Sequence, residues 1–234
     1  MLPCVKKECL LPTESSSYSA KNLLARYIIL AIGVLINSFG VAFITKAALG
    51  TSPISSFPFV LSLKWPSVSF GLFTFIMNTG LIVLQIILLR RDFQLVQLLQ
   101  MVVNVVFSWF IDVSMGLLGW LNPQGVVMQV AAVAVGCAIL GFGICVEIAP
   151  NVIMVPGEGC VRAIAAVTQK RFGTVKVLFD CTLVAIAIIC SMVFFGEIKG
   201  LGLGTIISAL LVGRMTNIYN RYFKPLDRIR ALSA

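Results

Sequence analysis

The sequence predicts an all-α integral membrane protein built from two inverted repeats of three transmembrane helices, each repeat with a broken or re-entrant segment. Three observations predict this fold: an apolar composition, six long apolar runs, and a pattern of glycine, proline and polar residues that occurs twice. Hydrophobic residues make up 59% of the 234 residues and charged residues only 12%. Because roughly a quarter of an ordinary globular chain is charged, the composition excludes a soluble domain.

Six apolar runs are long enough to cross a bilayer, which takes about 20 helical residues. They cover residues 27–45, 70–89, 95–118, 126–148, 175–195 and 201–219. We expect one membrane domain over 26–223, with a first repeat at 26–120 and a second at 124–223. Residues 1–25 and 224–234 are predicted to be short cytoplasmic tails.

The basic residues indicate the orientation of the chain. The net charge is +9, and the lysines and arginines cluster in the two tails, at Arg90-Arg91 and at Lys170-Arg171, whereas the loop 119–125 has no charge. Cytoplasmic loops carry an excess of Lys and Arg, so both termini are expected inside and this loop outside. Because the charges lie at membrane ends, they do not indicate a nucleic-acid partner.

The two halves of the chain share landmarks in the same order, which indicates a duplication. At a shift of 103 positions, Gly33, Phe39-Gly40 and Pro53 coincide with Gly136, Phe142-Gly143 and Pro156. At a shift of 102, Phe70-Gly71 and Asn78 coincide with Phe172-Gly173 and Asp180, and at a shift of 105, Asp112 coincides with Asn217.

Two interrupted segments, 47–63 and 149–169, each contain two prolines and polar residues. Neither can face lipid as a complete helix, because the freed backbone groups need partners that hydrocarbon does not supply. If both segments cross fully, the chain has eight spans and Arg90-Arg91 lies outside. If both are broken or re-entrant, it has six spans and the basic clusters lie inside. The charges favour six, and three spans per half make the halves inverted.

The interrupted segments also predict a binding site. Pro53 and Pro156 suit the first turn of a helix, and the N–H groups that follow offer a positive dipole end that favours an anionic or zwitterionic ligand. Two such helix starts could meet near the bilayer midplane, as in transporters with inverted repeats. The candidate substrate-binding residues are Thr51, Ser52, Ser55, Ser56, Asn78, Gly157, Glu158, Gly159, Arg162 and Asp180.

Two acidic residues within apolar surroundings have a structural and a functional interpretation. Glu158 either pairs with Arg162 at i,i+4 or binds substrate or a coupling proton. Asp180 either pairs with Lys176 or lines a pathway, as intramembrane ionisable residues often do.

Other polar residues are expected to have structural roles. Asp112, Asn217 and Glu147 lie nearer helix ends and suit interfacial anchoring. Asn37, Asn104 and Gln85 suit hydrogen bonding between helices, and the glycine-rich stretch Gly202–Gly213 suits close helix packing.

No feature of the sequence indicates an enzyme. The chain has no histidine and none of the HExxH, GxSxG or paired-aspartate signatures. We therefore expect no catalytic residue, no cofactor and no metal site.

Two stretches, KAALGTSPISSFP (Lys46–Pro58) and GLGTIISALLVG (Gly202–Gly213), resemble the YczE/YyaS/YitT family of bacterial multi-pass membrane proteins. The resemblance implies residence in the bacterial inner membrane and transport of small solutes. In that family an acidic residue typically follows the second stretch. Here Asn217 stands at that position, whereas the first half keeps Asp112.

These observations together predict a secondary transporter or permease for a small anionic or zwitterionic solute. The expected partners are the lipid bilayer and the solute, and a homo-oligomer is compatible with the sequence. Two alternatives stay open: a non-transporting regulatory or scaffold protein of the membrane, or a substrate-binding subunit of a larger importer.

Overall fold

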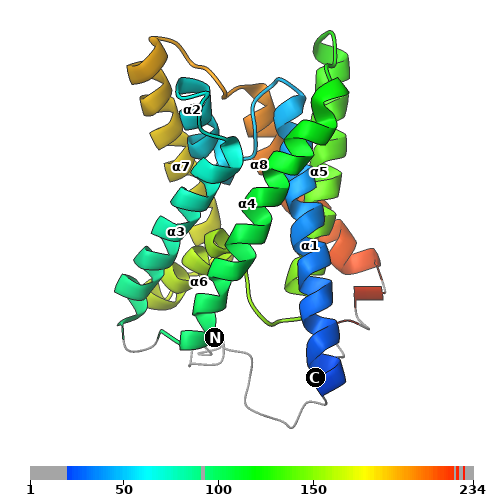
Figure 1. Ribbon diagram of the computed structural model, residues 1–234, viewed down its shortest axis with the longest axis vertical. Helices are drawn as coiled ribbons and strands as arrows, with labels where there is room; N and C mark the ends of the chain where they lie inside the picture. The colour runs from blue at the N-terminus through cyan, green and yellow to red at the C-terminus, as the bar shows by residue number, and fades with distance from the viewer. Residues whose placement is uncertain (1–19, 91–92, 224, 227–228, 230–234) are drawn as a thin grey trace.

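The computed structural model describes residues 20–90, 93–223, 225, 226 and 229, and these residues form helices and no strand (Figure 1). The six long helices are α1 (Ala20–Lys46), α3 (Phe70–Leu89), α4 (Gln100–Leu117), α5 (Val126–Ile148), α7 (Phe172–Phe195) and α8 (Leu203–Tyr222). Two short helices interrupt the series: α2 (Ser56–Lys64) and α6 (Pro156–Thr168). The all-α prediction is confirmed, and the predicted tails lie largely outside the described residues.

Five segments are long and apolar enough to cross a membrane. They are Asn22–Lys46, Phe70–Leu89, Leu95–Trp120, Val126–Ile148 and Phe172–Phe195, and each matches a predicted span. The sixth predicted span, 201–219, corresponds to α8, a helix of 20 residues. This helix is not apolar enough to be one of the five membrane-spanning segments. Arg214, Thr216 and Asn217 make its second half too polar. The protein is therefore membrane-embedded through five apolar helices, and α8 is the exception.

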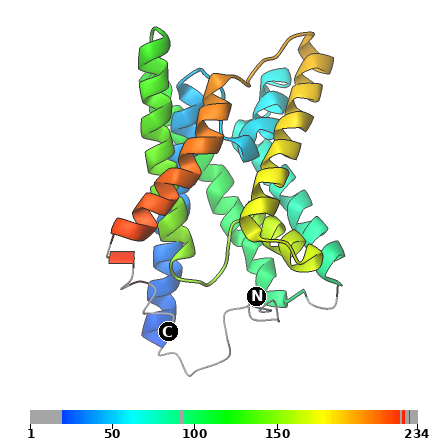
Figure 2. The same cartoon turned by 180° about the vertical axis from the view of Figure 1, so that it is seen from behind.

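The long helices alternate in direction along the long axis of the molecule (Figures 1 and 2). In Figure 1, α1, α4 and α7 run upward, whereas α3, α5 and α8 run downward. Helix α2 lies at the upper end, beside α7 and α3, and α6 lies toward the lower end. We refer to these as the α2 end and the α6 end.

Helices α1 and α5 form the closest pair in the core. Helices in a bilayer approach most closely where small residues let their backbones touch. At four glycines of this pair, an added Cβ would collide with the opposite helix: Gly33 with Glu147, Gly40 with Leu140, Gly136 with Ile44 and Gly143 with Asn37. Between these contacts, buried side chains such as Val34, Val41, Val133 and Cys137 fill the interface.

The glycine-rich start of α8 packs against the segment that follows α1. Gly204 N–H donates to the Leu49 carbonyl at 2.8 Å, and a Cβ on Gly202 or Gly204 would lie 2.7 Å from the same oxygen. These two glycines thus allow a close approach, as predicted for this stretch, but the partner is the loop after α1 and not another helix. Gly213, by contrast, has open space beside it.

The two interrupted segments contain short helices that begin at the predicted prolines. Pro53 starts a single 3₁₀ turn, η1 (Pro53–Ser55), which leads into α2, and Pro156 is the first residue of α6. Helix α2 has 9 residues and α6 has 13. At 1.5 Å per residue these helices are about 14 and 20 Å long, against roughly 30 Å of hydrocarbon. Neither can cross the bilayer as a helix, which counts against eight helical spans.

Substituting alanine for Gly143 should destabilise the protein, because the new Cβ would lie 2.6 Å from the Asn37 backbone nitrogen. Overpacking of this kind typically costs about 1–3 kcal/mol. The same change at Gly80, where no described residue lies within 4 Å of the added Cβ, serves as the matched control. Thermal unfolding in detergent should separate the two variants. Equal unfolding temperatures would contradict the close approach of α1 and α5.

Candidate functional site

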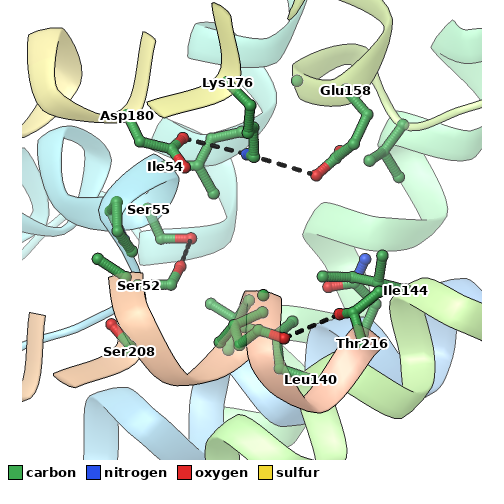
Figure 3. Close-up of a pocket in the computed structure, with 18 of the residues that line it drawn as sticks. Ser52, Ile54, Ser55, Leu140, Ile144, Glu158, Lys176, Asp180, Ser208 and Thr216 are labelled. Atoms are coloured by element: carbon green, nitrogen blue, oxygen red, sulfur yellow. Dashed lines mark hydrogen bonds and ion pairs between the residues drawn. The ribbon is translucent and has the colours of Figure 1, made fainter. Parts of the chain in front are cut away.

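A cavity of about 390 Å³ lies in the middle of the protein, between the starts of the two short helices (Figure 3). Residues of η1 and of the helices α1 and α3 to α8 line it. It reaches Ile148, the last residue of α5, and Phe172, the first residue of α7, so it extends toward the α6 end. Most of the exposed wall is apolar, and polar side chains from several helices interrupt it. A cavity of this kind is typical of small-molecule sites.

Three charged side chains meet at the cavity (Figure 3). Lys176 Nζ lies 3.0 Å from Asp180 Oδ1 and 3.7 Å from Glu158 Oε1. All three side chains are at most 26% exposed. The group, which we call the charge triad, combines two carboxylates with one ammonium. Charges removed from water are stable only when they are paired in this way.

The predicted pairing of the two carboxylates is half right. Lys176 pairs with Asp180 at i,i+4, as predicted for the structural interpretation of this aspartate. The predicted pair between Glu158 and Arg162 is wrong, because Glu158 reaches across to Lys176 on α7. Arg162 lines a different cavity. The i,i+4 spacing on α6 therefore does not decide the partner of Glu158, since a cation from a neighbouring helix competes for it.

The starts of the two interrupted helices meet at the cavity. The side chain of Ile54, in η1, contacts Gly157 in the first turn of α6, where a Cβ would leave no room for it. Beside this contact, Ser52 Oγ donates to Ser55 Oγ at 3.0 Å, and both hydroxyls line the cavity. No side chain caps α6 among the described residues. Its first N–H groups and its positive dipole end therefore lie at the cavity.

Six of the ten candidate substrate-binding residues line this cavity: Ser52, Ser55, Asn78, Gly157, Glu158 and Asp180. The other four lie away from it. The Thr51 hydroxyl bonds with that of Thr45 at 2.7 Å, and Ser56 Oγ donates to the Pro53 carbonyl at 2.6 Å. Gly159 and Arg162 face a second cavity. Side chains of a short helix point in all directions, so only one side of each interrupted segment faces the centre.

The second cavity, of about 260 Å³, lies between the start of α6 and the connection from α3 to α4. Gln85 Nε2 donates to the Pro156 carbonyl at 3.1 Å and to Gln100 Oε1 at 3.2 Å. Gly159 allows both amides to approach α6 closely. The prediction that Gln85 bonds between helices is confirmed.

Glu147 is the residue whose predicted role is most clearly wrong. It was expected to anchor the end of its span at the membrane interface, but it is 1% exposed. Asn37 Nδ2 donates to Glu147 Oε2 at 2.7 Å, and the Val155 N–H donates to Oε1 at 3.1 Å. Glu147 thereby joins α1 and α5 to the segment that precedes α6. Its place one residue from the end of an apolar run gave no sign of this burial.

Two other polar positions have structural partners. Asp112 accepts hydrogen bonds from Ser69 Oγ at 2.6 Å and from Gly71 N–H at 2.7 Å, and so caps the start of α3. Asn78 donates to Asn104 Oδ1 at 2.9 Å, which confirms the predicted packing role of Asn104.

Asn217 lines the central cavity. Among the described residues, no group of three or more histidine, cysteine or acidic side chains could hold a metal ion.

Comparison with known proteins identifies a family. The family model described as "Family of unknown function (DUF6198)" matches residues 24–221. The chain belongs to the DUF6198 family. No curated protein and no solved structure matches it. The DUF6198 region runs from the first turns of α1 to the last turn of α8, so it contains the whole cavity.

Removing the Glu147 carboxylate should be strongly destabilising, because Glu147→Ala leaves the Asn37 amide and the Val155 N–H without their acceptor. An unsatisfied buried donor costs about 1–3 kcal/mol. Glu147→Gln keeps one acceptor oxygen and should fall between the alanine variant and the natural protein. Glu197→Ala, which removes an exposed acid paired with Lys199, is the control and should have little effect. Thermal unfolding measures all three, and an unchanged Glu147→Ala variant would show that these bonds contribute nothing.

Proposed function

We propose that this protein is a secondary transporter or permease that binds a small zwitterionic or anionic solute in the central cavity. The observation that carries the proposal is the charge triad, Glu158, Lys176 and Asp180, beside the meeting point of two interrupted helices. Charged side chains at membrane depth are costly and usually mark transport pathways. Interrupted helices whose N-termini meet near the midplane are a recurrent way to bind substrates in transporters.

An inverted repeat is part of this proposal, and the helix contacts support it. At the shift of 103, the contact of Gly33 with Glu147 becomes that of Gly136 with Ile44. The contact of Gly40 with Leu140 likewise becomes that of Gly143 with Asn37. A two-fold axis in the membrane plane would relate such pairs.

Two further features support the same axis. The contact of Ile54 with Gly157 maps onto itself at this shift, as a contact on the axis must. The short helices α2 and α6 lie toward opposite ends of the molecule. With α8 counted as a sixth pass, each repeat contributes three passes in opposite orientations.

The basic residues support an orientation with the α6 end in the cytoplasm. Arg90 at the end of α3, Lys170 and Arg171 before α7, and Arg221 in the last turn of α8 lie at the α6 end. By the positive-inside bias, both termini would be cytoplasmic. Residence in the bacterial inner membrane remains a prediction from the resemblance to the YczE/YyaS/YitT family.

The chemistry of the cavity favours a zwitterion within the proposed class of solutes. The charge triad has one more negative than positive charge, so a simple anion would be repelled by the two carboxylates. An ammonium group would suit the place between Glu158 and Asp180, now filled by Lys176. A carboxylate would suit Lys176 and the uncapped N–H groups of α6. Glu158 and Asp180 are also the candidates for coupling solute movement to a proton.

A ligand of this site should stabilise the purified protein. At about 100 times its Kd, a ligand adds roughly 2.7 kcal/mol to the free energy of unfolding. Thermal unfolding against a library of small metabolites should show stabilisation by one chemical class. The double variant Asp180→Asn with Glu158→Gln should lose that effect, whereas the exposed-site control Glu197→Gln should keep it. If no metabolite stabilises the protein, transport through this cavity is not supported, and a protein partner becomes the better explanation.

A set of matched compounds tests the zwitterion directly. For an α-amino acid that stabilises the protein, the N-acetyl derivative removes the ammonium group and the methyl ester removes the carboxylate. Both derivatives should bind at least about tenfold more weakly than the parent, since each leaves charged groups of the cavity unpaired. A correspondingly higher concentration should be needed for the same rise in unfolding temperature. Uptake into liposomes should likewise be greatest for the parent compound and lower for both derivatives. An N-acetyl compound that binds as well as its parent would show that the site takes anions.

A further inference from the structure

The two repeats differ at one helix pair, and the first repeat holds that pair closed. At the α2 end, the start of α3 is bonded to α4 through Asp112, which accepts from Ser69 Oγ and Gly71 N–H. Gly71 lies so close to α4 that a Cβ would collide with the Ser108 carbonyl. We call this set of contacts the α3–α4 closure.

The α3–α4 closure continues toward the middle of the protein. Asn78 Nδ2 donates to Asn104 Oδ1 at 2.9 Å, and Asn104 Nδ2 donates to the Phe75 carbonyl at 3.1 Å. Both asparagines are at most 3% exposed. The contacts therefore join the two helices from the start of α3 to Asn78, which lines the cavity.

The corresponding positions of the second repeat are open. Gly71 and Asn78 correspond to Gly173 and Asp180 on α7, and Ser108 and Asp112 correspond to Gly213 and Asn217 on α8. All four residues of the second repeat line the central cavity.

In the described part of the chain, the face of α7 at Gly173 is uncovered, whereas α6 contacts α7 nearby through Glu158 and Lys176. Among the residues that the structure describes, nothing lies within 4 Å of a Cβ placed on Gly173, and no side chain caps α7. The residues that join α3 to α4 thus have counterparts that form opposite walls of the cavity.

We propose that α7 closes onto α8 in a second state, with Asn217 capping the start of α7, while the α3–α4 closure opens. This inference rests on the proposed transport function. When α7 closes onto α8 and α3 separates from α4, access to the cavity would change from the α6 end to the α2 end. In the second state the Asn217 side-chain oxygen accepts from the Gly173 N–H, as Asp112 accepts from Gly71. An amide is a weaker cap than a carboxylate, because charge-assisted hydrogen bonds are stronger and negative charge suits a helix start. That difference favours the observed state, in which Asp112 caps the start of α3 and no side chain among the described residues caps the start of α7.

A pair of engineered histidines tests this closure. Arg171 corresponds to Ser69, and Asn217 corresponds to Asp112. Ser69 and Asp112 form a hydrogen bond, so histidines at positions 171 and 217 should meet only when α7 closes onto α8. Both positions are exposed, and the natural chain has no histidine. Two imidazoles that meet can bind Zn²⁺ together.

The measurement is the unfolding temperature as a function of Zn²⁺ concentration. We compare Arg171→His/Asn217→His with each single variant and with the natural chain. The double variant should be stabilised at roughly tenfold lower Zn²⁺ than either single variant, and EDTA should reverse the effect. A second double variant, Arg171→His with Asn217→Asp, keeps the size of the Asn217 side chain. It still tests the closure if the first double variant fails to fold. Its histidine and carboxylate should also bind Zn²⁺ better than the matching single variants.

The results separate this inference from the proposed function. If neither pair binds Zn²⁺ better than its single variants, α7 does not close onto α8, and the inference is overturned even if a solute binds the cavity. If the pairs bind Zn²⁺ and no solute stabilises the protein, the closure stands and transport fails. If both occur, Zn²⁺ should block uptake into liposomes by the double variant and leave the natural chain active.

Discussion

Backbone groups that are freed inside a bilayer must find partners within the protein, and this constraint governs the structure around both interrupted segments. In the first segment, the Leu49 carbonyl accepts from Gly204 N–H, and Thr51 bonds to Thr205 and Ser208 of α8. The start of α8 is thereby fixed to the break after α1. Hydrocarbon could not supply these partners, so the breaks exist only because neighbouring helices bring polar groups to them.

The second segment meets the same constraint with different chemistry. Arg26 of α1 donates to the carbonyls of Pro150 and Asn151 at 2.9 and 3.1 Å, and Glu147 accepts from Val155 N–H. Charged side chains replace the hydroxyls of the first segment. The Arg26 and Glu147 side chains are 4% and 1% exposed, respectively, and are tolerated there because hydrogen bonds satisfy their polar atoms. The two breaks thus have similar positions and unlike sets of partners.

Features with a local cause could be predicted from the sequence. The long apolar runs, the two prolines at helix starts and the all-α fold follow from hydropathy and backbone chemistry within each segment. The general packing roles of Gln85 and Asn104 were predictable, but the particular partners of Glu147 and Glu158 were not. The burial of Glu147 requires Asn37 from another helix, and the choice of Lys176 by Glu158 requires the angle between α6 and α7. Only the six candidates on the inward sides of the interrupted segments and helices line the cavity.

The position of the charge triad connects the cavity with the proposed closure. In the first half of the chain, Asn78 of α3 faces Asn104 of α4, and the two neutral amides satisfy each other. Asp180 stands at the position of Asn78, but Ala209 stands at that of Asn104 and offers no hydrogen bond. Closing α7 onto α8 without a ligand would bury the carboxylates with fewer partners and less water, which costs free energy. A solute ammonium or a proton at the triad would lower that cost, so occupancy of the site would favour closure, as coupled transport requires.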